Sequence, residues 1–306
     1  MNHRRILRLL ILAAVAIAVS GCALVSEITF YGNLFRANQA GLRFRRTHEN
    51  LALAVPFSDR SDVTLDLFSP EEGDGHPVLI FVHGGGWNSY DKELFTPVAM
   101  QLLPQEMVVV IPDYTLYPDA TYRQMAREVA DATAWVLENI HDYGGDPNRV
   151  YLSGHSAGAH LSGLVAYDST WLAETGHSPE ELRGWIGLSG VYDVAAHEAQ
   201  RRARGLESPI MTAVMEGPGN FASASPISYA SGFGAGRAAL IHGAADETVP
   251  LAESERMDAA LEQAGFRSQL IIYPEAGHSD FLFGALGEDD APVILDIGRL
   301  VHGHLP

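Results

Sequence analysis

Short apolar runs recur along the chain from about residue 51 onward, separated by turn-forming residues. In the first run Val63, Leu65 and Leu67 alternate with polar neighbours, which predicts a strand with one buried face. The later runs are apolar throughout, as expected for strands covered on both faces. These later runs are Val78–Val82, Met107–Ile111, Val150–Ser153, Trp185–Leu188, Ala238–Ile241 and Leu270–Tyr273.

Apolar residues at helical spacing lie between these runs. The clearest stripe consists of Met125, Val129, Ala132, Val136 and Ile140. This stripe predicts a helix of about five turns. The helix should end at Gly144 and Gly145, because glycine accommodates a left-handed C-terminal turn. Further helices are predicted to begin at Ser156 and to cover Glu253–Ala264 and Val293–Val301.

Strands that alternate with helices predict a mostly parallel central sheet with right-handed crossovers and helices on both faces. One interval departs from this rhythm: about fifty residues between Leu188 and Ala238 show no strand pattern and include Arg201, Arg202 and Arg204. No linker sets this interval apart as a separate domain. We therefore expect a small lid or cap insertion over the sheet edge at about residues 190–235.

Composition and charge narrow the possible functions. The chain has 306 residues, 47% of them hydrophobic and 19% charged, which is typical of a globular protein with a sizeable core. The formal net charge is −18, so the protein should repel phosphate backbones, and we expect no nucleic-acid partner. We expect one large domain over residues 51–306, preceded by an N-terminal segment over residues 22–50.

The N-terminus has the features of an export signal. Arginines at positions 4, 5 and 8 precede the apolar run Leu9–Val19, and the small residues Ser20 and Gly21 follow it. We therefore expect residues 1–21 to be a cleaved signal peptide. An uncleaved anchor over Leu9–Val25 is the alternative, although that stretch is short for spanning a bilayer.

Cys22 directly follows this segment and is the only cysteine in the chain. The run Val19-Ser20-Gly21-Cys22 resembles the lipobox of bacterial lipoproteins, in which the cysteine is lipidated after cleavage. The resemblance implies an exported lipoprotein, anchored to a membrane through Cys22 and facing the periplasm or the cell exterior. Cleavage would remove three arginines and change the formal charge from −18 to −21.

The first chemical motif is Gly154-His155-Ser156-Ala157-Gly158, which fits G-x-S-x-G. It lies between a predicted strand and a predicted helix, where small residues allow a sharp turn that presents the Ser156 hydroxyl at the sheet edge. The helix N-terminus also directs backbone N–H groups at a developing negative charge. The alternative is that Ser156 only caps an ordinary helix.

The second motif is His83-Gly84-Gly85-Gly86-Trp87, directly after the strand Val78–Val82. Acyl transfer needs unshielded N–H donors for a negatively charged oxygen. The N–H groups of Gly85, Gly86 and Ala157 are the predicted oxyanion hole. A flexible turn is the alternative; a phosphate-binding loop would need G-x-G-x-x-G or a following Lys-Ser/Thr, and both are missing here.

A nucleophilic serine needs a histidine base and a carboxylate that orients it, and in α/β-hydrolases the chain order is Ser, acid, His. Asp246 follows the strand Ala238–Ile241 and His278 follows Leu270–Tyr273, so both lie at carboxyl ends of predicted parallel strands. Glu247 is the alternative acid. Asp280 is interpreted as a loop-capping residue.

The remaining candidate residues are given structural interpretations. His155 and His160 flank the nucleophile and should pack or hydrogen-bond locally, and His302 and His304 lie in the terminal tail. Trp87, Tyr90, Tyr192 and Phe221 either line the substrate pocket or pack under the lid, and we favour packing. With no cysteine pair and no H-E-x-x-H, we expect no metal site.

Together these motifs resemble the bacterial carboxylesterases of the hormone-sensitive-lipase type and their feruloyl-esterase-like relatives, most clearly over Val78–Asp168. The run from Gly144 to His160 is also similar to isoprenylcysteine methylesterases. The run Asp113-Tyr114-Thr115-Leu116-Tyr117-Pro118 matches the family's D-Y-R-L-x-P loop, except that Thr115 stands where arginine is usual. That departure puts the loop's local salt bridge in doubt.

The resemblance implies an α/β-hydrolase fold and hydrolysis of small-molecule carboxylic esters without a cofactor. The expected mechanism uses Ser156 as nucleophile, His278 as base and Asp246 as acid. Two alternatives remain. An amidase acting on formyl or aryl amides would share every one of these residues, and a surface lipoprotein that only binds partners would have lost catalysis.

Overall fold

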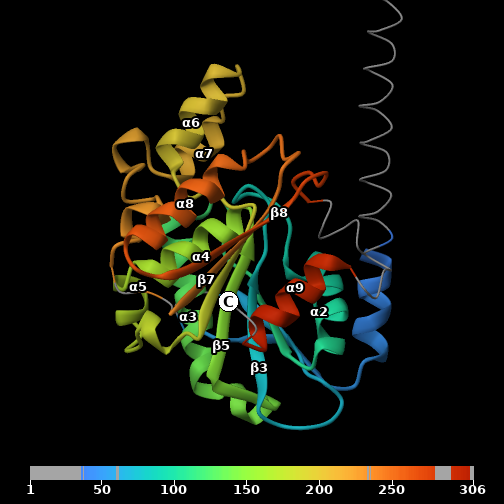
Figure 1. Cartoon of the computed structure of the whole chain (residues 1–306). Helices are drawn as coiled ribbons and strands as arrows, with labels where there is room; N and C mark the ends of the chain where they lie inside the picture. Colours follow the sequence, from blue (N-terminus) through green and yellow to red (C-terminus); the bar gives the residue numbers. More distant parts are fainter. Residues whose placement is uncertain are drawn as a thin grey trace, which may run out of the picture.

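The computed structural model describes residues 36, 38–59, 62–232, 234, 236–279 and 291–303 of the chain (Figure 1). Its centre is an eight-stranded sheet with the strand order β1-β2-β4-β3-β5-β6-β7-β8. The strands are β1 Leu51–Pro56, β2 Thr64–Phe68, β3 His76–Val82, β4 Val108–Pro112, β5 Gly145–His155, β6 Gly184–Leu188, β7 Arg237–Gly243 and β8 Arg267–Tyr273.

The sheet is mostly parallel, as predicted. The strands from β4 through β3, β5, β6 and β7 to β8 pair in parallel, whereas β1 and β2 add an antiparallel edge. Every strand predicted from an apolar run is present. β1 was not predicted, because its alternation is interrupted: the register shifts between Ala52 and Val55, and Ala54 has a φ of 53°.

Helices flank the sheet on both sides. The α-helices are α2 Thr96–Leu102, α3 Tyr122–Asn139, α4 Ala157–Tyr167, α5 Thr170–Ala173, α6 Val194–Ala203, α7 Pro209–Val214, α8 Ala252–Gln263 and α9 Pro292–Val301. Residues 38–47 are also helical. Short 3-10 helices are η1 Lys92–Phe95, η2 Leu103–Gln105, η3 Ile140–Tyr143, η4 Pro179–Glu181, η5 Pro218–Asn220 and η6 Pro226–Tyr229.

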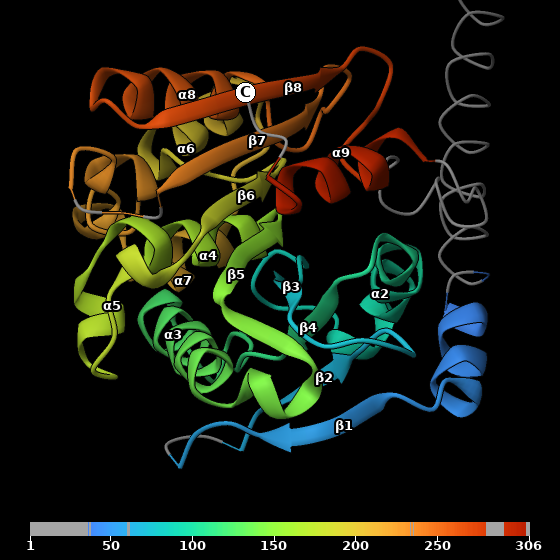
Figure 2. The ribbon, with the colours of Figure 1, turned by 60° about the horizontal axis from the view of Figure 1, so that its bottom comes forward.

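Two hydrophobic cores lie on opposite faces of the sheet. Figure 2 shows α3, α4 and α8 on one face and α2 and α9 on the other. Along β3, Ile80 and Val82 pack into the core beneath α3 and α4, whereas Leu79 and Phe81 pack into the core beneath α2 and α9. All four are fully buried, which explains why this strand is apolar throughout.

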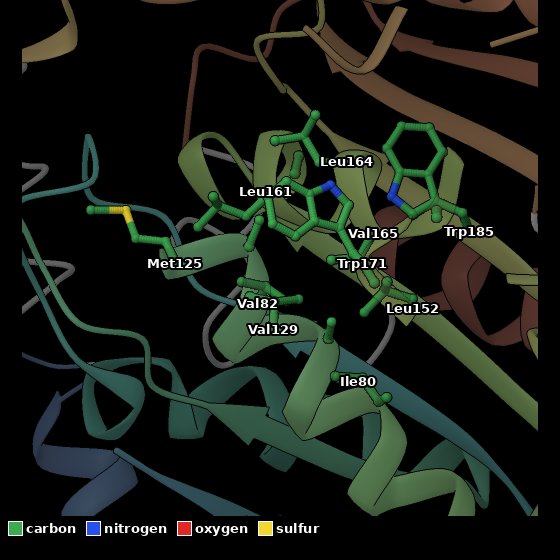
Figure 3. Close-up of a cluster of buried hydrophobic side chains, with 14 of the residues drawn as sticks. Ile80, Val82, Met125, Val129, Leu152, Leu161, Leu164, Val165, Trp171 and Trp185 are labelled. Carbon is green, nitrogen blue, oxygen red and sulfur yellow. The ribbon is translucent and has the colours of Figure 1, made fainter. Parts of the chain in front are cut away.

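The core under α3 and α4 fixes the helix that follows the central strand β5. Figure 3 shows Met125 and Val129 of α3 beside Leu161 and Leu164 of α4, over the β3 residue Ile80. The predicted stripe on α3 is thus the face that is buried. The predicted stop is also present, since Gly144 has a φ of 82° after η3.

The described part of the interval between β6 and β7 contains no strand, as expected; it holds α6, α7, η5 and η6. Figure 1 shows α6 and α7 projecting beyond one end of the sheet. The Arg204 guanidinium at the end of α6 donates to the Glu247 carbonyl, 3.1 Å away, in the loop after β7. The lid role of this interval stays a prediction.

The predicted signal segment and Cys22 lie outside the described residues. Within the residues that are described, no helix is both long and apolar enough to cross a membrane.

Candidate active site

The turn between β5 and α4 holds Ser156 in an unusual backbone conformation, with φ 54° and ψ −118°. Two glycines make the turn possible. A Cβ on Gly154 would lie 2.4 Å from the backbone of Gly158, and a Cβ on Gly158 would lie 2.0 Å from the Val82 carbonyl oxygen. The spacing of the G-x-S-x-G motif therefore follows from two close backbone contacts around the serine.

Three side chains from separate loops form one hydrogen-bonded row at the carboxyl edge of the sheet. The Ser156 Oγ lies 2.9 Å from His278 Nε2, and His278 Nδ1 lies 2.7 Å from Asp246 Oδ2. In this arrangement the serine hydroxyl donates to one ring nitrogen, and the other ring nitrogen donates to the carboxylate. The structure thus brings together the nucleophile, base and acid predicted from the sequence.

The surroundings of the Asp246 carboxylate stabilise its negative charge, although the side chain is fully buried. Its Oδ1 accepts from the backbone N–H groups of Thr248 at 2.9 Å and Val249 at 2.8 Å. Burial alone would raise the pKa of Asp246. Hydrogen bonds from His242 and His278 outweigh that effect and hold the pKa well below its usual value.

The other candidates for acid and base do not join this row. Glu247 is exposed, and its carbonyl is the group that contacts Arg204. His302 bonds instead to the Gln105 carbonyl at 2.6 Å. Asp280 and His304 lie outside the described residues.

The glycine-rich loop after β3 lies directly against the serine turn. A Cβ on Gly84 would lie 3.2 Å from the Ser156 Cβ, and a Cβ on Gly85 would lie 2.0 Å from the Ser89 carbonyl oxygen. Gly85 and Gly86 have φ values of 129° and 58°, which favour glycine. The close contacts therefore require glycine at positions 84 and 85, whereas Gly86 is favoured by its φ alone.

Neighbouring side chains fix the shape of this loop. His83 Nδ1 donates to the Gly84 carbonyl at 2.8 Å, and the Tyr114 hydroxyl donates to the His83 carbonyl at 3.1 Å. None of the hydrogen bonds among the described residues is donated by the N–H groups of Gly85, Gly86 or Ala157. These three N–H groups are thus not used by other groups in the described part of the chain.

Two histidines that flank the nucleophile are buried, as expected from their local-packing interpretation. His155 Nε2 donates to the His278 carbonyl at 2.8 Å, and His160 Nε2 donates to the Ala224 carbonyl at 2.7 Å. Burial disfavours the charged ring, so it lowers the pKa of His155 to about 3 and that of His160 to about 4. Both rings are therefore neutral near pH 7.

His242 is the functional neighbour that the sequence analysis missed. Its ring is fully buried, and its Nε2–H faces two acceptors, the Val249 carbonyl at 2.9 Å and the Asp246 Oδ2 at 3.3 Å. The Ser254 hydroxyl, 2.7 Å from Nδ1, donates to the opposite ring nitrogen. The signal in the sequence was a histidine directly after a predicted strand, four residues before the acid.

The aromatic residues considered for the pocket have different environments. Trp87 and Phe221 are buried, and the Trp87 indole N–H donates to His160 Nδ1 at 3.2 Å. Tyr192 is fully buried, with its ring edge-on to Trp185 at 5.4 Å. Tyr90 is exposed. The three buried rings belong to the core on the α3 and α4 side of the sheet.

The structure also shows what replaces the usual arginine of the D-Y-R-L-x-P loop. The Thr115 backbone N–H and hydroxyl donate to the buried Glu128 carboxylate at 2.6 Å and 2.8 Å. Gln124 adds a third donor at 3.1 Å. At this position the donors to the buried carboxylate are neutral groups.

No group of three or more His, Cys, Asp or Glu side chains that could hold a metal ion occurs among the residues that the structure describes. The row of Ser156, His278 and Asp246 consists of proton-transfer groups, and its chemistry requires only a substrate with an electrophilic carbon.

In α/β-hydrolases a sharp turn after a central parallel strand presents a serine to a histidine and an acid that follow it in the chain. This chain has that fold. Solved structures agree: a carbohydrate esterase from gut microbiota superposes with a TM-score of 0.67 at 20% identity, covering 84% of this chain and 96% of that one. Esterase 2 of Thermogutta terrifontis superposes with a TM-score of 0.65 at 23% identity, covering 85% of this chain and 94% of that one.

The chain belongs to the BD-FAE family, whose family model matches residues 65–261. It is 31% identical over 262 residues to the isoprenylcysteine alpha-carbonyl methylesterase ICME of Arabidopsis thaliana, covering 81% of this chain and 61% of that protein. It is 35% identical over 214 residues to the esterase LipQ of Mycobacterium tuberculosis, covering 68% and 50%. The predicted resemblance to esterases of this fold is confirmed, although the chain spans less than two thirds of the length of these relatives.

A formamidase is also similar to the chain. The kynurenine formamidase of Danio rerio is 27% identical to this chain over 252 residues. The match covers 79% of this chain and 79% of the formamidase. It bears on the amidase alternative that the sequence analysis left open.

Proposed function

We propose that the protein is a serine hydrolase of small-molecule carboxylic esters. The observation that supports this proposal is the hydrogen-bonded row from Ser156 through His278 to Asp246. The relatives ICME and LipQ are named as esterases, which favours an ester over other acyl compounds. The proposed reaction needs no cofactor, because the three side chains supply the nucleophile and every proton transfer.

In the first half of the reaction, Ser156 Oγ attacks the ester carbonyl carbon while His278 Nε2 accepts the hydroxyl proton. Asp246 stabilises the imidazolium that forms and keeps the ring in the required orientation. The N–H groups of Gly85, Gly86 and Ala157 donate to the oxyanion of the tetrahedral intermediate. His278 then returns the proton to the departing alcohol, which leaves an acyl-enzyme.

In the second half, water takes the place of the alcohol. His278 accepts a proton from this water, which attacks the acyl carbon, and the oxyanion is held by the same donors. Collapse of the second tetrahedral intermediate returns the proton to Ser156 and releases the carboxylic acid.

The direct test replaces Ser156 by alanine and measures kcat with p-nitrophenyl acetate. We expect a loss of about a million-fold, because removing the nucleophile abolishes covalent catalysis. Ser162→Ala is the matched control: Ser162 lies on the same helix, is buried and hydrogen-bonds Trp185 at 3.1 Å. Normal turnover by the folded Ser156→Ala variant would refute the proposal.

An amidase acting on formyl or aryl amides is the second candidate, because the Danio rerio relative is named as a formamidase. It would use the same three side chains, so geometry alone does not separate it from an esterase. A substrate panel does: we expect kcat/KM for p-nitrophenyl acetate to exceed that for N-formyl anilides. The reverse order would assign the protein to the amidases.

We also propose that residues 1–21 are an export signal and that Cys22 is lipidated, so that the enzyme is anchored to a membrane outside the cytoplasm. The supporting features are the arginines at positions 4, 5 and 8, the apolar run and the single cysteine. Mass measurement of the mature N-terminus tests this proposal. A lipid-modified Cys22 as residue one is expected, and an unprocessed Met1 would contradict it.

A further inference from the structure

We propose that His155 is a positioning residue for the base: its imidazole fixes the main chain of His278 against the serine turn. This inference rests on the proposed function, since it assigns a role within the same reaction. His155 touches none of the reacting atoms in the mechanism above, so its contribution would act through His278.

The contact that supports the proposal is a short hydrogen bond. His155 Nε2 lies 2.8 Å from the His278 carbonyl oxygen, and the two rings lie with their centroids 4.8 Å apart at 44°. A carbonyl only accepts, so His155 must carry its proton on Nε2. His155 is 3% exposed, so water does not compete for this bond.

The bond matters because His278 lies on a loop. β8 ends at Tyr273, and His278 follows five residues later. On the acid side, the loop is held by the Ala245 N–H, which donates to the Ala276 carbonyl at 3.0 Å. On the nucleophile side, the His155 bond holds it. The base is thus fixed from the loop of Asp246 and from the turn of Ser156.

The same ring also contacts the glycine-rich loop. A Cβ added to Gly84 would lie 2.9 Å from His155 Nδ1 and 3.0 Å from the His155 carbonyl oxygen. A side chain at position 84 would therefore displace the ring. One buried imidazole thus touches the oxyanion loop, the serine turn and the base loop.

The charge state of His155 suits this role. Burial, with a smaller contribution from the neighbouring His278 ring, lowers its pKa to about 3 against the opposing effects of the bond to the His278 carbonyl and of Asp246. During catalysis His278 becomes an imidazolium. A neutral His155 holds its main chain without placing a second positive charge beside it.

The test compares His155→Leu, which removes the donor, with His155→Gln, whose side-chain amide can donate to the same carbonyl. With p-nitrophenyl acetate we expect His155→Leu to lower kcat about ten- to a hundredfold while KM changes less than about twofold, because a misplaced base slows only the chemical steps. His155→Gln should recover most of that loss. A purely structural role would not distinguish donor from non-donor at equal folding.

A spectroscopic readout separates positioning from general destabilisation. The proton between His278 Nδ1 and Asp246 should give a far-downfield NMR signal in the wild type, and His155→Leu should broaden or abolish it. His160→Leu is the matched control: it removes buried bonds to the Ala224 carbonyl and from the Trp87 indole, but no bond to His278, and should leave the signal in place. If His155→Leu does not fold, His155→Gln against the shorter His155→Asn supplies the same comparison.

Equal kcat in the donor and non-donor variants, or an unchanged downfield signal in His155→Leu, would overturn the inference. These outcomes differ from failure of the proposed function. If the proposed function failed, the wild-type protein itself would hydrolyse no ester, and its kcat would be no higher than that of Ser156→Ala.

Discussion

Ser156 occupies a backbone conformation that L-residues rarely adopt, with φ 54° and ψ −118°. Strain of this kind costs of order 1–3 kcal/mol and persists only where surrounding structure enforces it. Here the close contacts of Gly154 and Gly158 enforce it. The serine is thus held ready to react at the expense of local stability.

This strain can be measured by comparing two inactive variants. Ser156→Gly should be more stable than Ser156→Ala by about 1 kcal/mol, because glycine adopts positive φ without a Cβ penalty. Urea unfolding gives both free energies. If the alanine variant proves equally or more stable, the serine turn is unstrained.

The sequence predicted the three residues of the row because each stands in a recognisable place: Ser156 in a turn motif, Asp246 and His278 directly after predicted strands. It did not predict the partners that orient them. His155, at the end of β5, contacts the His278 carbonyl 123 positions away in the sequence. His242, in β7, contacts the Asp246 carboxylate four positions away. Such contacts depend on ring orientation and burial, which residue spacing does not specify.

At the scale of elements, the contact between α4 and β3 sets the position of the serine turn relative to the sheet. Gly158, in the first turn of α4, faces the Val82 carbonyl at the end of β3. Because the neighbour is backbone, it has little freedom to move away from an added methyl group.

Gly158→Ala should therefore destabilise the protein by about 3 kcal/mol and lower kcat by displacing the turn. Gly163→Ala on the same helix is the control: its added Cβ would meet side chains, those of Pro226 and Trp185, at 3.2 Å, which is much farther than the 2.0 Å to backbone at Gly158. Urea unfolding together with ester turnover checks both. Similar behaviour of the two variants would show that the α4–β3 contact does not fix the turn.

The helices and strands that the sequence predicted correctly were those with a clear pattern of apolar residues. The stripe on α3 and the buried runs of β3, β4, β6 and β7 were each found at nearly the right bounds. β5 begins earlier than predicted, at Gly145. The expectation that the last run is covered on both faces was wrong, because β8 is an edge strand and is only partly buried. β1 and α2 were missed for opposite reasons. β1 is an edge strand with a register shift, whereas α2 is short and buried over most of its surface, so it has no polar face to reveal a helical period.

For the whole molecule, buried neutral histidines predict a loss of stability in mild acid. Burial lowers the pKa of His155 to about 3, and of His160 and His197 to about 4, from an ordinary value of 6.5. Below pH 6.5 the unfolded chain takes up protons at these positions and the folded protein does not. The stability present above pH 6.5 is therefore lost progressively as pH falls towards 4.

Each of these histidines should lower the free energy of unfolding by about 2 kcal/mol between pH 7.5 and pH 5. Urea unfolding at the two pH values measures the total, and His160→Gln, which lacks one titrating ring, should show a smaller change. Equal stability of the wild type at pH 7.5 and pH 5 would contradict the burial of neutral rings.

The most direct test of the central claim is chemical labelling of the whole protein by a fluorophosphonate, followed by peptide mass mapping. Such probes report a serine whose hydroxyl is activated by a neighbouring base. We predict one adduct, on Ser156, that is lost in His278→Ala. An adduct on a different serine would contradict the assignment of Ser156 as nucleophile. Failure of the folded wild-type protein to react would contradict the whole account and favour a protein that only binds partners.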